Sequence, residues 1–300
     1  MSPPRTHHVI SFIVAALTAG VLLFGGCQAP LKEPLGPEIE LLKGKGDIAA
    51  AVAAVNAHRE FVKPIGAGGN CLIEWFDDDG KPHKENPGIQ LRLVPPDHLY
   101  FSGDILGGEA IRLGTNAEEF WFRIKPKEVS SYWWGKRAVA RACGGEGQLG
   151  PESLLEALGV VEVDETWTLS SRPGYDILTL KGDAGLPVKR IEVDWRDYLV
   201  RRIEHFDGSG ETSVVVNMSG YTDGAGELAG IVVPTRIAIV YFNMPNGGLL
   251  TDIKLRDLKP FQPTEARMKG KLFKRPSDNG FKNIYELDED CKFTKGPQGP

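Results

Sequence analysis

The stretch V-K-R-I-E-V-D-W-R-D-Y-L-V-R-R-I-E-H-F, residues 188–206, alternates apolar and charged side chains on both sides of Arg196-Asp197-Tyr198. Alternation with a period of two is typical of a half-buried β-strand, so the stretch predicts an antiparallel hairpin with a three-residue connection. The predicted register pairs Arg190 with Glu204, Ile191 with Ile203, Glu192 with Arg202 and Trp195 with Leu199. Ile191, Val193 and Trp195 then share the buried face, and a slip by one residue would bury arginines and acids.

Similar short runs of aromatic and β-branched residues continue along the chain, separated by Gly, Pro, Asp and Asn. They predict strands at residues 71–76, 89–94, 98–103, 109–114, 119–124, 129–135, 167–170, 175–181, 188–195, 199–206, 212–221, 232–242 and 249–258. The predicted fold class is mainly β with a few helices. Strands at this spacing favour one large curved antiparallel sheet, a sandwich or a barrel.

Two helices are expected among these strands. The first follows Asp47, whose side chain is a good N-cap, and ends before Pro64. The second begins at Pro151 and ends at Gly159, with Leu154, Leu155 and Leu158 on one face.

The N-terminal segment has the layout of a secretory signal. Arg5 precedes an unbroken apolar stretch, Val9 to Phe24, which Gly25-Gly26-Cys27 follows. Residues 1–26 are therefore predicted to be a removable signal peptide, and Cys27 resembles the diacylglycerol-modified cysteine of bacterial lipoproteins. Residues 27–46 are rich in Pro, Gly, Lys and Glu and predict a flexible tether. The alternative is an uncleaved anchor helix, although spanning a bilayer takes about twenty apolar residues.

Composition and motifs narrow the function classes. The 300 residues carry 35 Lys+Arg against 40 Asp+Glu, a formal net charge of −5 at pH 7, without a basic stripe, which argues against a nucleic-acid partner. The sequence has no phosphate-binding loop, zinc-protease motif or nucleophile elbow. We therefore predict no enzymatic activity, no cofactor and no metal site. A hydrolase whose catalytic residues meet only in space stays as a third hypothesis.

The cysteines other than Cys27 are Cys71, Cys143 and Cys291, and their spacing is not that of a zinc site. An exported protein permits a disulfide, and three cysteines allow at most one. The sequence does not choose the pair.

Apolar side chains at alternate strand positions share one face of the predicted sheet. The candidates are Trp75, Leu91, Leu93, Leu99, Phe101, Phe120, Phe122 and Trp133. This face is either an ordinary core or, in a strongly curved sheet, the wall of a cavity for an apolar ligand. The cavity hypothesis requires an apolar pocket of about 300 Å³ or more, whereas a packed interior favours the core.

Four motifs after the Asp47 helix resemble the LolA/LolB superfamily of periplasmic lipoprotein carriers and receptors. They are L-R-L-V-P-P-D-H-L-Y-F-S-G (Leu91 to Gly103), R-L-G-T-N-A-E-E-F-W-F-R-I-K-P (Arg112 to Pro126), Y-W-W-G (Tyr132 to Gly135) and P-E-S-L-L-E-A-L-G (Pro151 to Gly159). The resemblance implies one antiparallel sheet bent into an incomplete barrel at residues 47–260, with helices as a lid over a cavity that holds acyl chains. Residues 261–300 form an added C-terminal extension.

An acylated N-terminus is similar to that of the receptor LolB. In receptor-type members an exposed apolar residue between the third and fourth strands enters the membrane, and the matching position here is Leu106. The alternative is that Ile105 and Leu106 fold back onto the sheet.

Together these features predict an exported, lipid-anchored envelope protein on the periplasmic face of the outer membrane, which binds a lipid or lipoprotein acyl chain in an apolar cavity. Its predicted partners are that chain and the membrane, through the anchor, and the sequence names no protein partner. The alternative is a structural or interaction lipoprotein with a filled core and no ligand.

The anchor is tested by replacing Cys27 with Ala. Without the thiol no lipid can be attached, so the variant is expected to leave the detergent phase when cells are extracted and phase-separated. Continued partitioning of a correctly cleaved variant into detergent would contradict the assignment.

Overall fold

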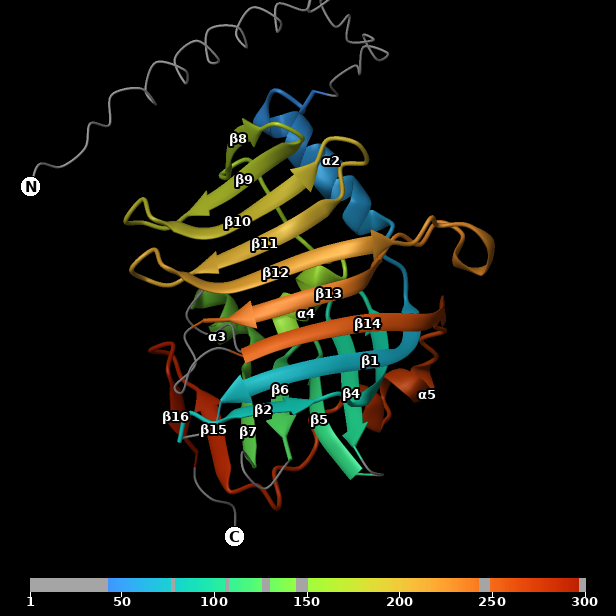
Figure 1. Cartoon of the computed structure of the whole chain (residues 1–300), viewed down its shortest axis with the longest axis vertical. Helices are drawn as coiled ribbons and strands as arrows, with labels where there is room; N and C mark the ends of the chain where they lie inside the picture. Colours follow the sequence, from blue (N-terminus) through green and yellow to red (C-terminus); the bar gives the residue numbers. More distant parts are fainter. Residues whose placement is uncertain are drawn as a thin grey trace, which may run out of the picture. The chain divides into compact units, whose positions relative to one another are not determined.

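The computed structural model describes residues 43–76, 79–105, 108–125, 130–143, 151–242 and 249–296. The chain divides into the units Met1–Leu41 and Leu42–Pro300, and all described residues belong to the second unit, called the body below (Figure 1). Cys27, the signal peptide, most of the tether and Leu106 lie outside the described residues. No helix of the body's described ranges is long and apolar enough to cross a membrane.

The described strands of the body join in a single sheet of sixteen strands. The strands are β1 (Ile65–Phe76), β2 (Pro82–Glu85), β3 (Gly88–Val94), β4 (His98–Ile105), β5 (Gly108–Thr115), β6 (Glu119–Ile124), β7 (Ser131–Lys136), β8 (Thr168–Arg172), β9 (Tyr175–Lys181), β10 (Pro187–Asp194), β11 (Val200–Phe206), β12 (Thr212–Tyr221), β13 (Pro234–Tyr241), β14 (Leu249–Pro260), β15 (Asn283–Leu287) and β16 (Phe293–Lys295). Their order is β16-β15-β7-β6-β5-β4-β3-β1-β14-β13-β12-β11-β10-β9-β8, with β2 beside β1. Because β8 and β16 stand at opposite ends of this order, the sheet is open.

Short helices accompany the sheet: α2 (Ile48–Glu60), α3 (Arg137–Ala142), α4 (Pro151–Ala157), α5 (Glu265–Met268) and the 3-10 turns η1 (Gly226–Leu228) and η2 (Lys271–Phe273). The predicted cap of the first helix is present, since Asp47 Oδ1 accepts a hydrogen bond of 2.9 Å from the Ala50 amide. The second predicted helix is α4, and Leu154, Leu155 and, just after the helix, Leu158 are all buried.

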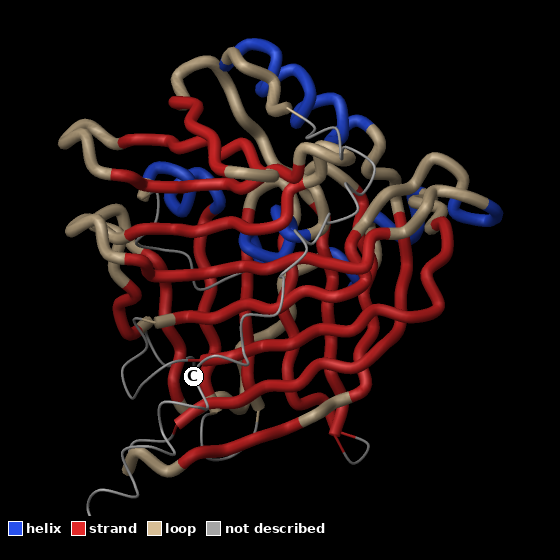
Figure 2. Tube along the Cα trace, turned by 45° about the horizontal axis from the view of Figure 1, so that its top comes forward, coloured by secondary structure: helices blue, strands red, loops and turns tan. Residues whose placement is uncertain are grey.

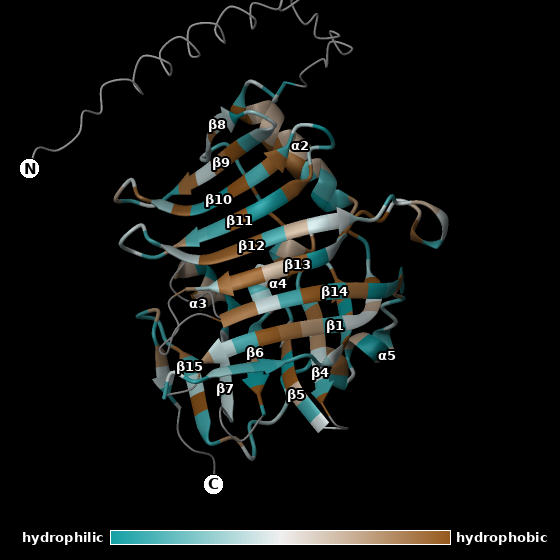
Figure 3. Ribbon diagram, viewed as in Figure 1, coloured by the Kyte–Doolittle hydropathy of each residue, from teal (hydrophilic) through white to brown (hydrophobic). Residues whose placement is uncertain are grey.

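The sheet is bent around α4. This helix contacts β5 and β6 on one side and β12 and β13 on the other. In the strand order β5 and β13 are five steps apart, about 24 Å in a flat sheet, whereas seven helical residues extend only about 10 Å. Figure 2 shows the result, with the strands of one half running across those of the other. Hydrophobic and hydrophilic residues alternate along many strands (Figure 3), and the buried hydrophobic residues of both halves form one core on the concave face.

The hairpin register is confirmed over most of its length. Arg190 pairs with Glu204, Ile191 with Ile203 and Glu192 with Arg202. The pairing of Trp195 with Leu199 is wrong. A bulge follows Glu192, so that Val193 pairs with Val200, and the Asp194 amide donates to the Leu199 carbonyl at 3.0 Å. The cause is the turn, in which Tyr198 adopts a φ of 58° and its amide donates to the Asp194 carbonyl at 2.8 Å.

Predicted and observed strands differ in two further places. β1 begins at Ile65 rather than residue 71, because Gly69 lies so close to β14 that a Cβ there would stand 2.0 Å from the Lys254 carbonyl oxygen. The C-terminal segment contributes β15 and β16 to the same sheet, and β15 pairs with β7 in parallel. The sheet is thus mixed rather than wholly antiparallel.

The C-terminal segment covers the face of β6 and β7 that points away from α4. Trp121, Tyr132 and Ile284 form a second apolar cluster there. The Tyr132 hydroxyl donates to the Pro276 carbonyl at 2.8 Å, and a disulfide joins Cys143, after α3, to Cys291, between β15 and β16. Cys71 is the buried free cysteine.

Replacing Cys291 with Ser tests the contribution of the disulfide. A cross-link over 148 residues restricts the unfolded chain, and the chain-entropy estimate is a loss of about 3–5 kcal/mol in the free energy of unfolding. Urea unfolding of the oxidised parent and of the variant measures the difference. Equal midpoints would show that β15 and β16 hold without the cross-link.

Candidate functional site

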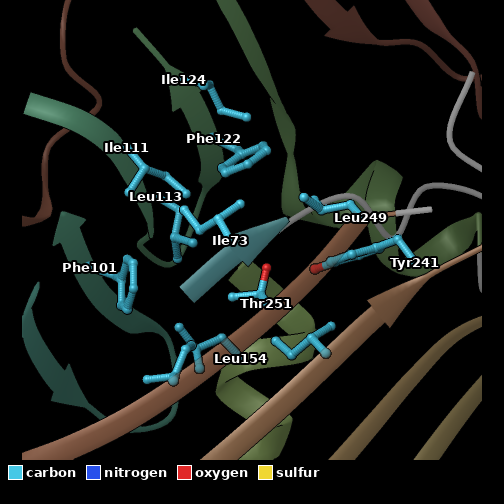
Figure 4. A pocket seen from close by; sticks show the side chains of 12 residues that line it. Ile73, Phe101, Ile111, Leu113, Phe122, Ile124, Leu154, Tyr241, Leu249 and Thr251 are labelled. Carbon is cyan, nitrogen blue, oxygen red and sulfur yellow. The ribbon is translucent and has the colours of Figure 1, made fainter. Parts of the chain in front are cut away.

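The concave face contains an apolar pocket between the two halves of the sheet. Its side chains come from β1 (Ile73), β4 (Phe101), β5 (Ile111, Leu113), β6 (Phe122, Ile124), α4 (Leu154), β13 (Ile239, Tyr241) and β14 (Leu249, Thr251, Ile253). In Figure 4 the labelled side chains from both halves surround a shared space. Nearly all of this lining is aliphatic or aromatic, which suits a hydrocarbon chain.

The pocket is small, with a volume of about 40 Å³. Small-molecule sites begin near 300 Å³, so the predicted size is wrong for this conformation. The reason is α4, because Leu154 projects into the concavity, and Leu154, its neighbour Leu155 and Leu158 just after the helix are each at most 1% exposed. Sequence alternation locates the apolar face but does not show how far a helix fills it.

The predicted wall residues divide into three groups. Phe101 and Phe122 line the pocket. Leu91, Leu93 and Leu99 are fully buried in the core beside it, and Trp75 and Trp133 pack against that core while partly exposed. Phe120 is buried against Phe293 of β16, with ring centroids 6.4 Å apart.

Sequence reasoning missed several lining residues. Ile111 and Leu113 alternate along β5 just as the chosen residues do, so the same signal was available for them. Leu154 was recognised as apolar but assigned only to a helix face. The pocket residues of β13 and β14 also alternate along their strands, but no local pattern places them opposite β5 and β6, because the bend that does so is a long-range feature.

Two polar side chains interrupt the apolar lining, Tyr241 and Thr251. Burial raises the pKa of the Tyr241 phenol to about 12, with Ser153 of α4 acting in the opposite direction. The phenol is therefore neutral over the physiological range and is a hydrogen-bonding group within the pocket.

The side of α4 that faces away from the pocket is held by charges. Glu152 accepts a hydrogen bond of 2.7 Å from Arg137 Nε, and Arg137 also contacts Asp97. Glu156 contacts Lys189 of β10, and its Oε2 lies 3.1 Å from Nε2 of the fully buried His205 of β11. Such buried contacts fix the position of a helix, since removing one partner leaves a charge without compensation.

Comparisons with known proteins give structural neighbours only. No family model and no curated protein matches the sequence. A LolA superfamily protein from Nitrosomonas europaea is 12% identical, over 75% of this chain and 97% of that one, with a TM-score of 0.46. A DUF1329 family protein from Desulfovibrio piger is 10% identical, over 76% and 99%, with a TM-score of 0.46. An outer membrane lipoprotein-sorting domain from Vibrio parahaemolyticus is 10% identical, over 71% and 93%, with a TM-score of 0.43.

The topology itself agrees with the resemblance noted in the sequence. The body has one open, bent sheet with a helix inside its concavity. This is the architecture that the LolA/LolB-like motifs imply, apart from the parallel pairing of β7 with β15.

Glu156 gives a pH-dependent test of how α4 is held. Burial acts to raise its pKa, but Lys189 and His205 outweigh burial and hold the pKa at about 2, below the ordinary 4.5. The ionised group therefore stabilises the fold above pH 4.5, and this contribution is lost as the pH falls towards 2. Replacing Glu156 with Gln is expected to lower the free energy of unfolding at pH 7 by about 3 kcal/mol.

The measurement is urea unfolding between pH 3 and 7, where the difference between parent and variant should shrink as the pH falls. Glu162→Gln is the matched control, since that side chain is 80% exposed and its pairing with Arg59 should contribute at most about 1 kcal/mol. A difference that stays constant with pH would contradict the assignment.

Proposed function

We propose that this protein is a lipid-anchored, non-enzymatic component of the cell envelope that binds a lipid or lipoprotein acyl chain in the concavity of its sheet. The observation that carries the proposal is the apolar pocket lined from both halves of the sheet, with Leu154 of α4 as part of its wall. Residues 1–26 act as the signal peptide, Cys27 carries the anchor, and residues 27–46 tether the body at the periplasmic face of the outer membrane.

The acyl chain enters when α4 leaves the concavity. A pocket of about 40 Å³ does not hold such a chain, but the buried leucines of α4, with Leu158 just after it, occupy space of the same apolar character. A chain that replaces them meets the aliphatic and aromatic side chains that the helix contacted. Displacement rather than filling of an empty cavity is therefore the mode of binding.

The second candidate function is that of a structural or interaction lipoprotein with a filled core. The volume of the apolar pocket favours this candidate. The two candidate functions differ in whether a hydrocarbon chain can displace α4 from the concavity.

Native mass spectrometry of the full chain carrying Cys27→Ala separates them, because any bound lipid is then non-covalent. We expect a lipid adduct, either retained during purification or formed with dodecanoate. Leu113→Glu places a carboxylate in the pocket, and burying it beside a hydrocarbon chain costs several kcal/mol, so the bound fraction should fall at least tenfold.

Leu250→Glu is the matched control. Leu249 and Thr251 line the pocket, so the Leu250 side chain points to the other face of β14 and its replacement should leave the adduct intact. Absence of any adduct in the parent, with dodecanoate present, would favour the filled-core candidate.

A further inference from the structure

Helix α4 separates the apolar pocket from a second cavity of different character. The second cavity has a volume of about 480 Å³ and is lined by Glu152, Leu155 and Glu156 of α4, together with charged side chains of α2, α3 and β10 and with His205 of β11. Leu154, in contrast, faces the apolar pocket. The same short helix therefore lines an apolar pocket with one side chain and a polar cavity with others.

The carboxylates in this polar cavity are already engaged by cations. Arg137 binds both Glu152 and Asp97. Lys189 binds Glu156, and Arg59 lies 3.4 Å from Glu162. The acceptor groups of the lining thus have their own partners.

Donor groups in the same lining have capacity to spare. The Arg141 side chain is 64% exposed and reaches Asp97 only at 3.5 Å, which leaves most of its guanidinium N–H groups for a ligand. Lys189 has three N–H donors and contacts one carboxylate oxygen of Glu156.

His205 is the second, independent observation. Its side chain is fully buried and lines the polar cavity, and Glu156 is the partner of one ring nitrogen only. Nε2 lies 3.1 Å from Glu156 Oε2, whereas Nδ1 has no hydrogen-bond partner among the residues that the structure describes. Buried polar atoms without partners are rare because each costs about 1–3 kcal/mol, so Nδ1 is a hydrogen-bonding group available to a ligand.

We propose that the polar cavity binds the anionic head group, a phosphate or carboxylate, of the amphiphile whose acyl chain enters the apolar pocket. This inference rests on the proposed function. Arg141, Lys189 and His205 hold the head group through charge-assisted hydrogen bonds, and the chain occupies the space that Leu154 vacates. The ligand class is therefore a single-chain or multi-chain anionic lipid rather than a neutral one.

The test compares three probes on the full chain carrying Cys27→Ala: dodecyl phosphate, dodecanol and inorganic phosphate. Titration calorimetry is expected to give dodecyl phosphate at least tenfold tighter binding than dodecanol, and inorganic phosphate only weak binding. Arg141→Gln should weaken dodecyl phosphate about tenfold and leave dodecanol unchanged. Arg172→Gln is the matched control, because that half-exposed arginine pairs with Glu192 and lies outside the cavity lining.

A second measurement follows the His205 side chain by NMR, without replacing that residue. The chain has only six histidines, so the ¹⁵N resonances of the His205 side chain can be assigned. They should shift with dodecyl phosphate and not with dodecanol.

The outcomes distinguish failure of the head-group site from failure of the acyl-chain proposal. Equal binding of the phosphate and the alcohol, with the His205 resonances unmoved, would overturn the head-group site while the acyl-chain proposal stands. Binding of neither probe would overturn both. Inorganic phosphate that binds as tightly as dodecyl phosphate would mark the cavity as a free-anion site and overturn its connection with the apolar pocket.

Discussion

The buried contact of Glu156 with Lys189 and His205 is the interaction on which the rest of the body depends. A bent sheet exposes an apolar concave face that must be covered, and seven helical residues do most of the covering here. So short a helix has little stability of its own. It keeps its place because apolar side chains hold one side against the sheet, and Glu152 and Glu156 hold the other side against α3, β10 and β11.

The free energy of burying the apolar side of α4 and that of its charge contacts together decide whether the helix can be displaced. Burying three leucines contributes about 5–9 kcal/mol, and breaking a buried ion pair costs a further 3–5 kcal/mol. A twelve-carbon chain offers about 9 kcal/mol if each CH₂ is buried. Hydrocarbon alone is thus close to balance with the helix, and in the proposed mode of binding a head group that engages the freed cations supplies the difference. Short-range charge contacts would then select the ligand, and apolar burial would retain it.

Much of the fold could be predicted from local pattern. The strands at 119–124, 175–181 and 212–221 are found at the predicted residues, and three pairs of the hairpin, two between opposite charges and one between isoleucines, have the predicted register. The predicted pairing of Trp195 with Leu199 is wrong because nothing in the neighbouring sequence signals that Tyr198 takes a positive φ. The partners of β15 and Cys291 lie about 150 residues away, and no period or spacing encodes such distances. Likewise Phe101 and Phe122 were found as pocket residues, whereas Ile239 and Leu249 needed the bend itself.

The parallel pairing of β15 with β7 sets an order on assembly. Residues 283–295 complete an edge of the sheet that begins with residues 131–136, so a part of the chain made later protects a part made about 150 residues earlier. Until those residues arrive, β7 is an open edge beside exposed aromatic rings, the kind of surface that joins other chains. An oxidising compartment then fixes the cover by closing Cys143 onto Cys291. A chain that lacks β15 and β16, or that is held in a reducing compartment, is therefore expected to aggregate through the open edge of β7, whether or not its pocket still forms.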